Sequence, residues 1–299
     1  MDDAPPGYAV MLSTPTRKQC REAALVLQSV GLHGKMVRRR GEWTVIVRQS
    51  DFEAAERHWS SYCQENPPAD PHPDEQVPLF GGAWHAVVAY LLVLMTFATL
   101  SFRGFAGYDW FTAGQMQAGR VLQGELWRVV TALTLHADGT HLVSNLAFGA
   151  IFGLLAGRIL GGGLAWLVIV LAGALGNAMN AIVQGDAHTS IGASTSVFAA
   201  LGVLVSHALI PRTSTPQSRL RRFSPLVGGV VLLAMMGLEG ERTDVSAHVT
   251  GFLAGLVLGG LGCRLPTRWL AGTVVQWTSG LAAIIVILTA WGVAIAAGQ

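Results

Sequence analysis

The chain has 299 residues, of which 51% are hydrophobic and only 13% charged, against about 25% charged in an ordinary soluble protein. It has 36 glycines and three cysteines without CxxC spacing, which argues against a disulfide scaffold or a zinc ribbon. The net charge of +2 says little, because the charges are unevenly distributed. This composition predicts a polytopic α-helical membrane protein, in which glycines let helices approach closely.

Residues 1–66 are expected to form a small cytoplasmic α+β domain with the element order β-α-β-β-α. The strand patterns predict a hairpin around Gly41, and Ser50 with Glu53 fits a capping box at the start of the second helix. The apolar helix faces are expected to contain Cys20, Ala24 and Leu27 in the first helix, and Phe52, Ala55, Trp59 and Tyr62 in the second. This domain shows no catalytic cluster, and its sequence indicates no particular partner.

Residues 67–80 contain five prolines and are expected to form an extended linker. Beyond them, residues 81–265 are expected to form a core of six membrane spans, and residues 266–299 an additional seventh span. The segment at 103–139 is too polar for a plain span and too apolar for an ordinary loop, so part of it is expected to lie in the membrane interface. Apolar stretches near the length needed to cross a bilayer lie at about 83–102, 140–160, 163–183, 194–210, 225–239, 247–263 and 270–296.

The charges beyond residue 80 predict the orientation. If the N-terminus is cytoplasmic, the loops after the second, fourth and sixth spans face inward and hold arginines such as Arg158, Arg222 and Arg268. All seven acidic residues beyond position 80 then face outward, which satisfies the positive-inside rule. We therefore expect a multi-pass protein of a bacterial cytoplasmic membrane, with its C-terminus outside.

Polar residues gather at one level of these spans. His141 and Asn145 open the second span, Ser194 opens the fourth and His248 opens the sixth. Even-numbered spans all begin on the outer side, and a helix rises about 1.5 Å per residue, so the four residues should share a depth just below the outer surface. Polar groups inside a membrane are expensive, which makes them candidates for function.

The spacing within each helix agrees with a shared site. His141 and Asn145 are four residues apart and lie on one helix face. Gly251 and Gly255 share a face with His248, and glycines there would let the sixth span approach the fourth. A serine becomes a good nucleophile when a neighbouring base takes its proton, and histidine is the usual base near neutral pH.

Four motifs in order make residues 83–265 resemble the rhomboid intramembrane serine proteases. These are "WR" at Trp127-Arg128, "HADGTHLVSN" from His136 to Asn145, "GAST" from Gly192 to Thr195, and "AHVTGFLAG" from Ala247 to Gly255. The resemblance implies a six-span fold and an endopeptidase that cuts transmembrane segments of membrane proteins near the outer face, with no cofactor, metal or nucleic acid.

The resemblance also implies the roles of individual residues. Ser194 would be the nucleophile and His248 the general base, a dyad without a carboxylate. His141, Asn145 and the Ser194 backbone would form the oxyanion hole. Phe198 would lie under the His248 ring. The remaining positions carried over as supporting residues are Trp127, Arg128, His136, Gly192, Gly251 and Gly255.

Thr195 departs from the family pattern, which usually has glycine after the nucleophile; its side chain could narrow the site or alter substrate preference. A non-catalytic rhomboid-like protein that binds membrane clients is therefore the main alternative. A zinc peptidase or metal transporter using His136, His141 and His248 is a third, although no HExxH motif is present. Ser194 as a simple packing or capping residue is the structural alternative. His188 is expected to be solvated in an outer loop.

Overall fold

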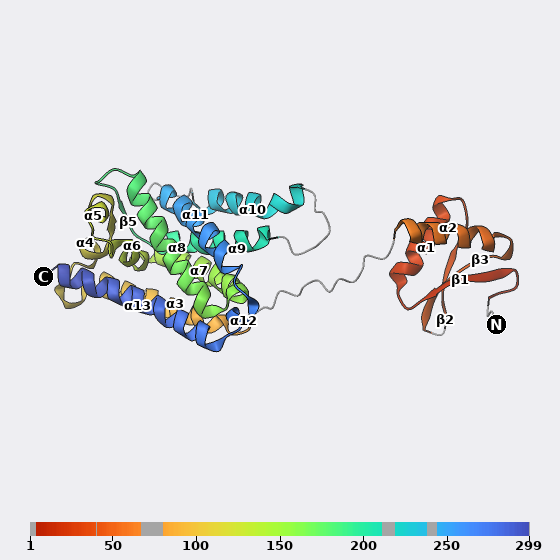
Figure 1. The fold of residues 1–299 in the computed structure, drawn as a ribbon, viewed down its shortest axis with the longest axis horizontal. Helices are drawn as coiled ribbons and strands as arrows, with labels where there is room; N and C mark the ends of the chain where they lie inside the picture. Colours follow the sequence, from red (N-terminus) through yellow and green to blue (C-terminus); the bar gives the residue numbers. More distant parts are fainter. Residues whose placement is uncertain (1–3, 40, 67–79, 211–218, 238–243, 299) are drawn as a thin grey trace. The chain divides into compact units, whose positions relative to one another are not determined.

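The computed structural model describes residues 4–39, 41–66, 80–210, 219–237 and 244–298 (Figure 1). Contacts divide the chain into two compact units, Met1–Asp74 and Glu75–Gln299. The linker predicted at 67–80 lies outside the described residues except for Phe80.

The first unit is a three-stranded antiparallel sheet with two helices. Strands β1 (Tyr8–Thr14), β2 (Lys35–Arg39) and β3 (Glu42–Arg48) lie in the order β1-β3-β2, with α1 (Arg17–Ser29) and α2 (Phe52–Glu65) following β1 and β3. Its core contains Cys20, Ala23, Leu27, Val45, Val47 and Ala55. The order β-α-β-β-α predicted from the sequence is the order observed.

One local prediction in this unit was wrong, and another is extended. Ala24 is partly buried on the face of α1 that contains Cys20 and Leu27, and Ala23, which the prediction omitted, is fully buried there. The capping box of Ser50 and Glu53 does not form. A 3-10 turn at Gln49–Asp51 precedes α2, and the Ser50 hydroxyl donates to the Asp51 carboxylate at 2.9 Å instead of capping the helix.

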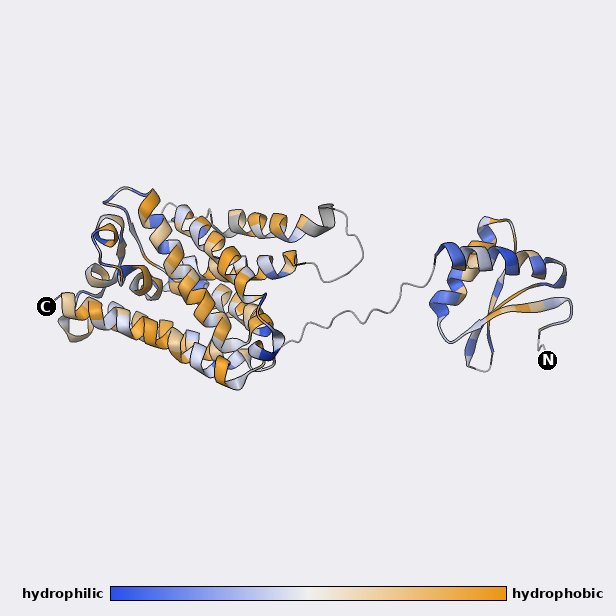
Figure 2. Cartoon of the chain, viewed as in Figure 1, coloured by the Kyte–Doolittle hydropathy of each residue, from blue (hydrophilic) through white to orange (hydrophobic). Residues whose placement is uncertain are grey.

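The second unit has the helical fold of a polytopic membrane protein, and the residues described in it include five long apolar helices (Figure 2). The described residues also include two helices with shorter apolar stretches, α9 (Ser194–Leu209) and α10 (Arg219–Gly237). Helix α10 begins six residues before the predicted apolar stretch at 225, because the helix continues through basic residues that hydropathy excludes. The five long helices are α3 (Ala83–Phe102), α7 (Gly139–Leu160), α8 (Gly162–Val183), α11 (Val245–Gly262) and α13 (Thr273–Ala297).

The segment between α3 and α7 folds into short elements instead of a span or an open loop. They are η2 (Phe105–Gly107), α4 (Trp110–Gly114), β4 (Met116–Gln117), α5 (Ala118–Leu122), α6 (Arg128–Thr131) and η3 (Ala132–Thr134). Strand β4 pairs with β5 (Thr189–Ser190), immediately before α9. This two-residue pairing joins the segment to the start of α9.

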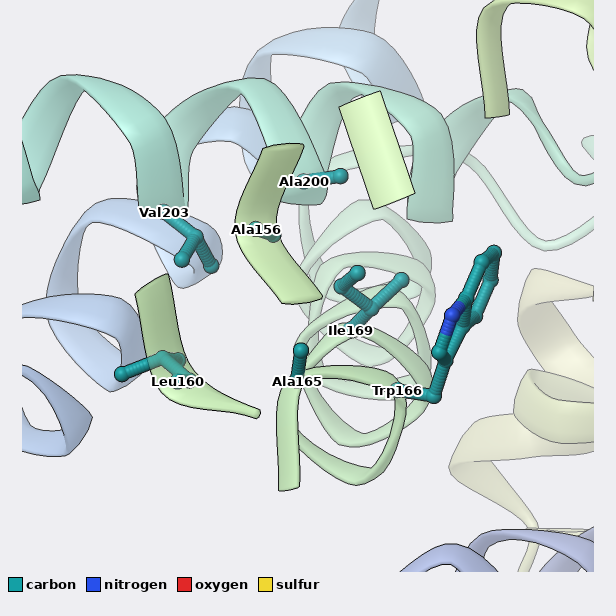
Figure 3. Packing of buried hydrophobic residues seen from close by; sticks show 7 residues of the cluster. All are labelled: Ala156, Leu160, Ala165, Trp166, Ile169, Ala200 and Val203. Carbon is teal, nitrogen blue, oxygen red and sulfur yellow. The ribbon is translucent and has the colours of Figure 1, made fainter. Parts of the chain in front are cut away.

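Helix α9 packs against α7, α8 and α11. Figure 3 shows side chains from three of these helices meeting in one apolar cluster, which contains Ala156, Leu160, Ala165, Trp166, Ile169, Ala200 and Val203. Small residues among them let the helices pack closely.

Helix α13 is joined to the turn between α7 and α8. The Gln276 side chain donates to the Leu160 carbonyl at 3.0 Å and accepts from the Leu164 N–H at 3.1 Å. It thus satisfies backbone groups that both helix ends leave without intrahelical partners. Gly161 takes a φ of +81° in this turn, a conformation that favours glycine. The last helix is therefore part of the packed unit.

Candidate active site

Ser194 is the first residue of α9, and it is partly exposed. With 16 residues, α9 is about 24 Å long, shorter than the roughly 30 Å of a bilayer core. The first N–H groups of a helix lack intrahelical acceptors and carry partial positive charge. The Ser194 N–H is one of these groups, so it can donate to an oxyanion formed beside its own hydroxyl.

Gly192 shapes the approach to Ser194. Its φ is +128°, and its N–H donates to the Ala132 carbonyl at 2.9 Å. A Cβ at this position would lie 2.7 Å from His141 Nε2 and 3.5 Å from Ser194 Oγ. Any side chain here would therefore meet the imidazole. The absence of one lets His141 and the Ser194 hydroxyl face the same space.

His248 lies in the first turn of α11 and is 6% exposed. Its ring lies on Phe198, with centroids 4.4 Å apart and planes tilted by 35°. Phe198 is four residues after Ser194, so the two lie on the same face of α9. The ring contact expected from the sequence is thus present, and it holds the imidazole over the helix face that begins with Ser194.

Glycines bring α11 against α9. Gly251, Gly255 and Gly259 recur every four residues along α11. A Cβ added to Gly255 would lie 2.7 Å from the Cα of Ala199, and a Cβ added to Gly259 would lie 2.6 Å from the Cα of Val203. The approach predicted for Gly251 and Gly255 is therefore present and extends one turn further. It fixes the depth of His248 relative to α9.

Thr195 does not narrow the site. It is 2% exposed, and its Cγ2 lies 2.9 Å from the points where a Cβ of Gly176 or Gly251 would stand. The methyl group thus fills space between α8 and α11, which those two glycines leave open. Ser196 is also turned away, since its buried hydroxyl packs beside Gly173 of α8.

His141 and Asn145 follow one another on α7. The Asp138 carboxylate caps this helix by accepting from the His141 N–H at 2.8 Å. His141 Nδ1 accepts from the Ala137 N–H at 3.5 Å, which assigns the ring proton to Nε2, the atom that faces Gly192. Asn145 is 4% exposed and uses one amide hydrogen on the His141 carbonyl, so its second remains to donate.

His136 supports the neighbouring histidine. It is fully buried, its ring meets the His141 ring edge to face at 5.2 Å, and its Nε2 accepts from the Ala193 N–H at 3.5 Å. Burial, and then the nearby His141, lower the pKa of His136 to about 4, so it is neutral near neutral pH. Among the described residues, no three His, Cys, Asp or Glu side chains are grouped so as to hold a metal ion.

Trp127 and Arg128 stabilise the segment between α3 and α7. Arg128 is 3% exposed and binds the Glu125 carboxylate at 2.5 Å and the Thr112 and Gln115 carbonyls at 2.9 Å. All these partners belong to the same segment. Trp127 packs in the apolar cluster around α4 and α13.

Sequence reasoning missed a polar network at the start of α11. Asp244 caps this helix, and its carboxylate accepts from the Ala247 N–H at 3.0 Å and from the Ser246 hydroxyl at 2.7 Å. It also binds His188 Nε2 and Asn180 Nδ2, both at 2.8 Å. His188 is therefore paired with a carboxylate, contrary to the solvated state expected. An aspartate just before an apolar helix is a capping signal that predicts part of this network.

Residues 123–265 match the Rhomboid domain family. The chain is 30% identical over 148 residues to RHOMBOID-like protein 5 of Arabidopsis thaliana, covering 49% of this chain and 47% of that protein. It is 28% identical over 138 residues to the Putative rhomboid protease YdcA of Bacillus subtilis (strain 168), covering 46% of this chain and 68% of that protein.

A third relative is Rhomboid protease GlpG of Haemophilus influenzae, with 27% identity over 146 residues, or 47% of this chain and 72% of that protein. The chain spans about half the length of several of these relatives, including 46% of RHOMBOID-like protein 7 of Arabidopsis thaliana.

Proposed function

This chain belongs to the rhomboid family over residues 123–265, and from that premise we propose that it is an intramembrane serine endopeptidase. Ser194 is the proposed nucleophile and His248 its general base. The observation that carries this proposal is the convergence on Ser194: the His248 ring is held by Phe198 on the helix face that Ser194 begins, and His141 faces the serine across Gly192.

In the proposed first step, His248 takes the proton of the Ser194 hydroxyl as Oγ attacks the scissile carbonyl carbon. The carbonyl oxygen becomes an oxyanion. The Ser194 N–H, His141 Nε2 and the free Asn145 amide hydrogen are the proposed donors to it. Preorganised donors of this kind each contribute about 10²–10³ in rate.

When the tetrahedral intermediate collapses, the carbon–nitrogen bond breaks and His248 gives its proton to the departing amine. The product is an ester between the substrate and Ser194. Water then attacks this ester as His248 takes its proton. When the carbon–oxygen bond to Ser194 breaks, His248 returns that proton to Oγ, which releases the carboxylic acid and restores the free serine. The two half-reactions balance without a cofactor.

The proposed substrates are transmembrane segments of other membrane proteins. In this proposal the start of α9 lies below the membrane surface on the side of the acidic loops, so the bond to be cut must reach that depth. A helical substrate hides its carbonyls in hydrogen bonds, and helix-breaking residues near the cut would expose them. The excess of arginines in the opposite loops supports an outward-facing site.

Cleavage of a model transmembrane substrate by the purified chain tests this proposal. We expect Ser194→Ala and His248→Ala each to abolish measurable turnover, since loss of a nucleophile or base lowers rates by about 10⁴–10⁶. Ser196→Ala is the matched control, because its hydroxyl is buried against α8. Equal cleavage by Ser194→Ala and the parent would refute the dyad.

The alternative is a rhomboid-like protein without activity that binds membrane clients. A fluorophosphonate that reacts with activated serines separates the two. Labelling of the parent chain and not of Ser194→Ala supports the protease. Absence of labelling, together with retained binding of a transmembrane client, supports the alternative.

A further inference from the structure

A large apolar cavity lies between α3, α8 and α13, and its lining reaches Ala193 and Ser196, on either side of Ser194. Its volume is about 650 Å³, within the range of about 300–1,000 Å³ found for ligand sites. Ala89 and Val93 of α3 line one wall, and Gly280 and Ala283 of α13 line the opposite one. Its walls are mostly apolar, so they suit a hydrocarbon ligand.

The cavity is long and runs along the helices. Along α3 its lining extends from the N-cap residue Gly82 to Leu94, and on α13 it extends from Thr273 to Ile287. At 1.5 Å per residue these stretches are about 18–21 Å long. One leaflet of a bilayer contributes about half of the 30 Å hydrocarbon core. The cavity is therefore long enough to hold an extended acyl chain from one leaflet.

The end of the cavity lined by Phe80, Gly82 and Thr273 lies where α3 and α13 begin, and we call this end the mouth. Arginines lie near it. Phe80 lines the mouth, and its N–H donates to the Arg158 carbonyl at 3.0 Å. Arg268 lies in α12 (Thr267–Leu270), whose last residue also lines the mouth. Both arginines are exposed. Basic residues beside a cleft between membrane helices favour anionic lipid headgroups.

Tryptophans at the same end indicate the membrane interface. Trp84, Trp269 and Trp277 are 56%, 55% and 77% exposed, and each belongs to an element that lines the mouth. Exposed tryptophans are typical of the headgroup level of a bilayer. A lipid phosphate at this level would lie near the two arginines while its chain enters the cavity.

We propose that this cavity binds one anionic phospholipid. One acyl chain lies between α3, α8 and α13, and the phosphate lies at the mouth near Arg158 and Arg268. The apolar walls favour the acyl chain, and the two arginines favour a negatively charged headgroup. The phosphate position at the mouth is distinct from Ser194 and His248, and lipid binding can be measured without cleavage.

Counting the lipids on the full chain tests the cavity. The protein is purified in a mild detergent, incubated with phosphatidylglycerol and examined by native mass spectrometry. A Cβ at Gly280 meets only Gly163 Cα, at 3.5 Å, so Gly280→Leu fills the cavity. Gly292→Leu is the matched control on the same helix, since a Cβ there meets nothing within 4 Å.

We expect the parent and Gly292→Leu to retain one tightly bound phosphatidylglycerol and Gly280→Leu to lose it. Ala89→Leu fills the cavity from the opposite wall and should also lose it, which guards against a folding defect in one variant. Retention of the same lipid by both filled variants, or no bound lipid in the parent, would overturn the proposal.

The headgroup is tested by competition. The parent should bind phosphatidylglycerol at least about tenfold more tightly than phosphatidylcholine. Arg158→Gln combined with Arg268→Gln should remove this preference, whereas Arg103→Gln at the far end of α3 should not. Equal binding of the two lipids by the parent would refute the anionic headgroup.

Discussion

The indole N–H of Trp291 donates a hydrogen bond of 3.0 Å to the hydroxyl of Thr134. This bond joins the last helix of the chain to the segment that reaches His136 two residues later. Trp291 also stacks on Phe97 with centroids 5.2 Å apart, and the edge of its ring lies where a Cβ of Gly114 would stand. Helix α13 thus packs against the segment that holds His136, next to the proposed oxyanion residue His141.

Trp291→Phe should lower the free energy of unfolding by roughly 2–3 kcal/mol, because one buried hydrogen bond is lost and the smaller ring leaves part of the indole's space unfilled. Trp291→Ala should lower it by about 3–5 kcal/mol, because it leaves a cavity. Thermal unfolding in detergent measures both. Trp277→Phe is the control, since that ring is 77% exposed and should leave stability unchanged. An equal effect at both positions would contradict this assignment.

Thr195→Ser removes a methyl group that packs between Gly176 and Gly251. We expect a loss of stability of about 1 kcal/mol, the usual cost of deleting one buried methyl group. The rate of cleavage should not change, because this side chain points away from Ser194. A changed cleavage-site preference in Thr195→Ser would show that the threonine does contact substrate.

His141→Ala and Asn145→Ala should each lower kcat by about 10²–10³ with little change in KM, if both donate to the oxyanion. Ser144→Ala is the control on the exposed side of the same helical turn. Steady-state kinetics with a transmembrane substrate separates the two constants. A rise in KM alone would instead assign these residues to substrate binding.

Asp244 makes the stability of the unit sensitive to acid. Burial raises the pKa of its carboxyl, but hydrogen bonds from Ala247, Ser246, His188 and Ser190 outweigh this and lower the pKa to about 2. A depressed folded pKa contributes stability above the unfolded value near 3.8, and this contribution is lost as pH falls towards 2.

The contribution is on the order of 2 kcal/mol. In Asp244→Asn the free energy of unfolding should fall less between pH 5 and pH 2 than it does in the parent. Chemical unfolding at a series of pH values measures this difference. If the free energy of unfolding falls equally with pH in both proteins, another carboxyl is responsible for the acid sensitivity.

The sequence predicted the long helices well, because about 20 consecutive apolar residues have few alternatives to a span. The range predicted for α3 matches the observed one, and Ser194 was correctly expected at a helix start. The contact of Phe198 with His248 was also predicted, from helical spacing combined with the family resemblance. These features depend on local periodicity or on short motifs.

Other features could not be predicted because they depend on long-range pairing. Strands β4 and β5 have two residues each, too few to show an alternating pattern, and they pair across more than 70 positions of sequence. The partnership of His188 with Asp244 likewise joins a loop to a distant helix cap. The orientation of the Thr195 side chain could not be predicted either, because it depends on the space left by Gly176 and Gly251 in two other helices.

Those glycines have a consequence for evolution in this family. A β-branched residue after the proposed nucleophile is tolerated here because positions 176 and 251 both lack a side chain. Backbone contacts also require these glycines, since a Cβ at Gly251 would clash with the Thr195 carbonyl oxygen and one at Gly176 would lie 2.7 Å from Gly251 Cα. Both positions should therefore remain glycine in relatives whichever residue follows the serine, and a search pattern that demands glycine after the serine would overlook chains such as this one.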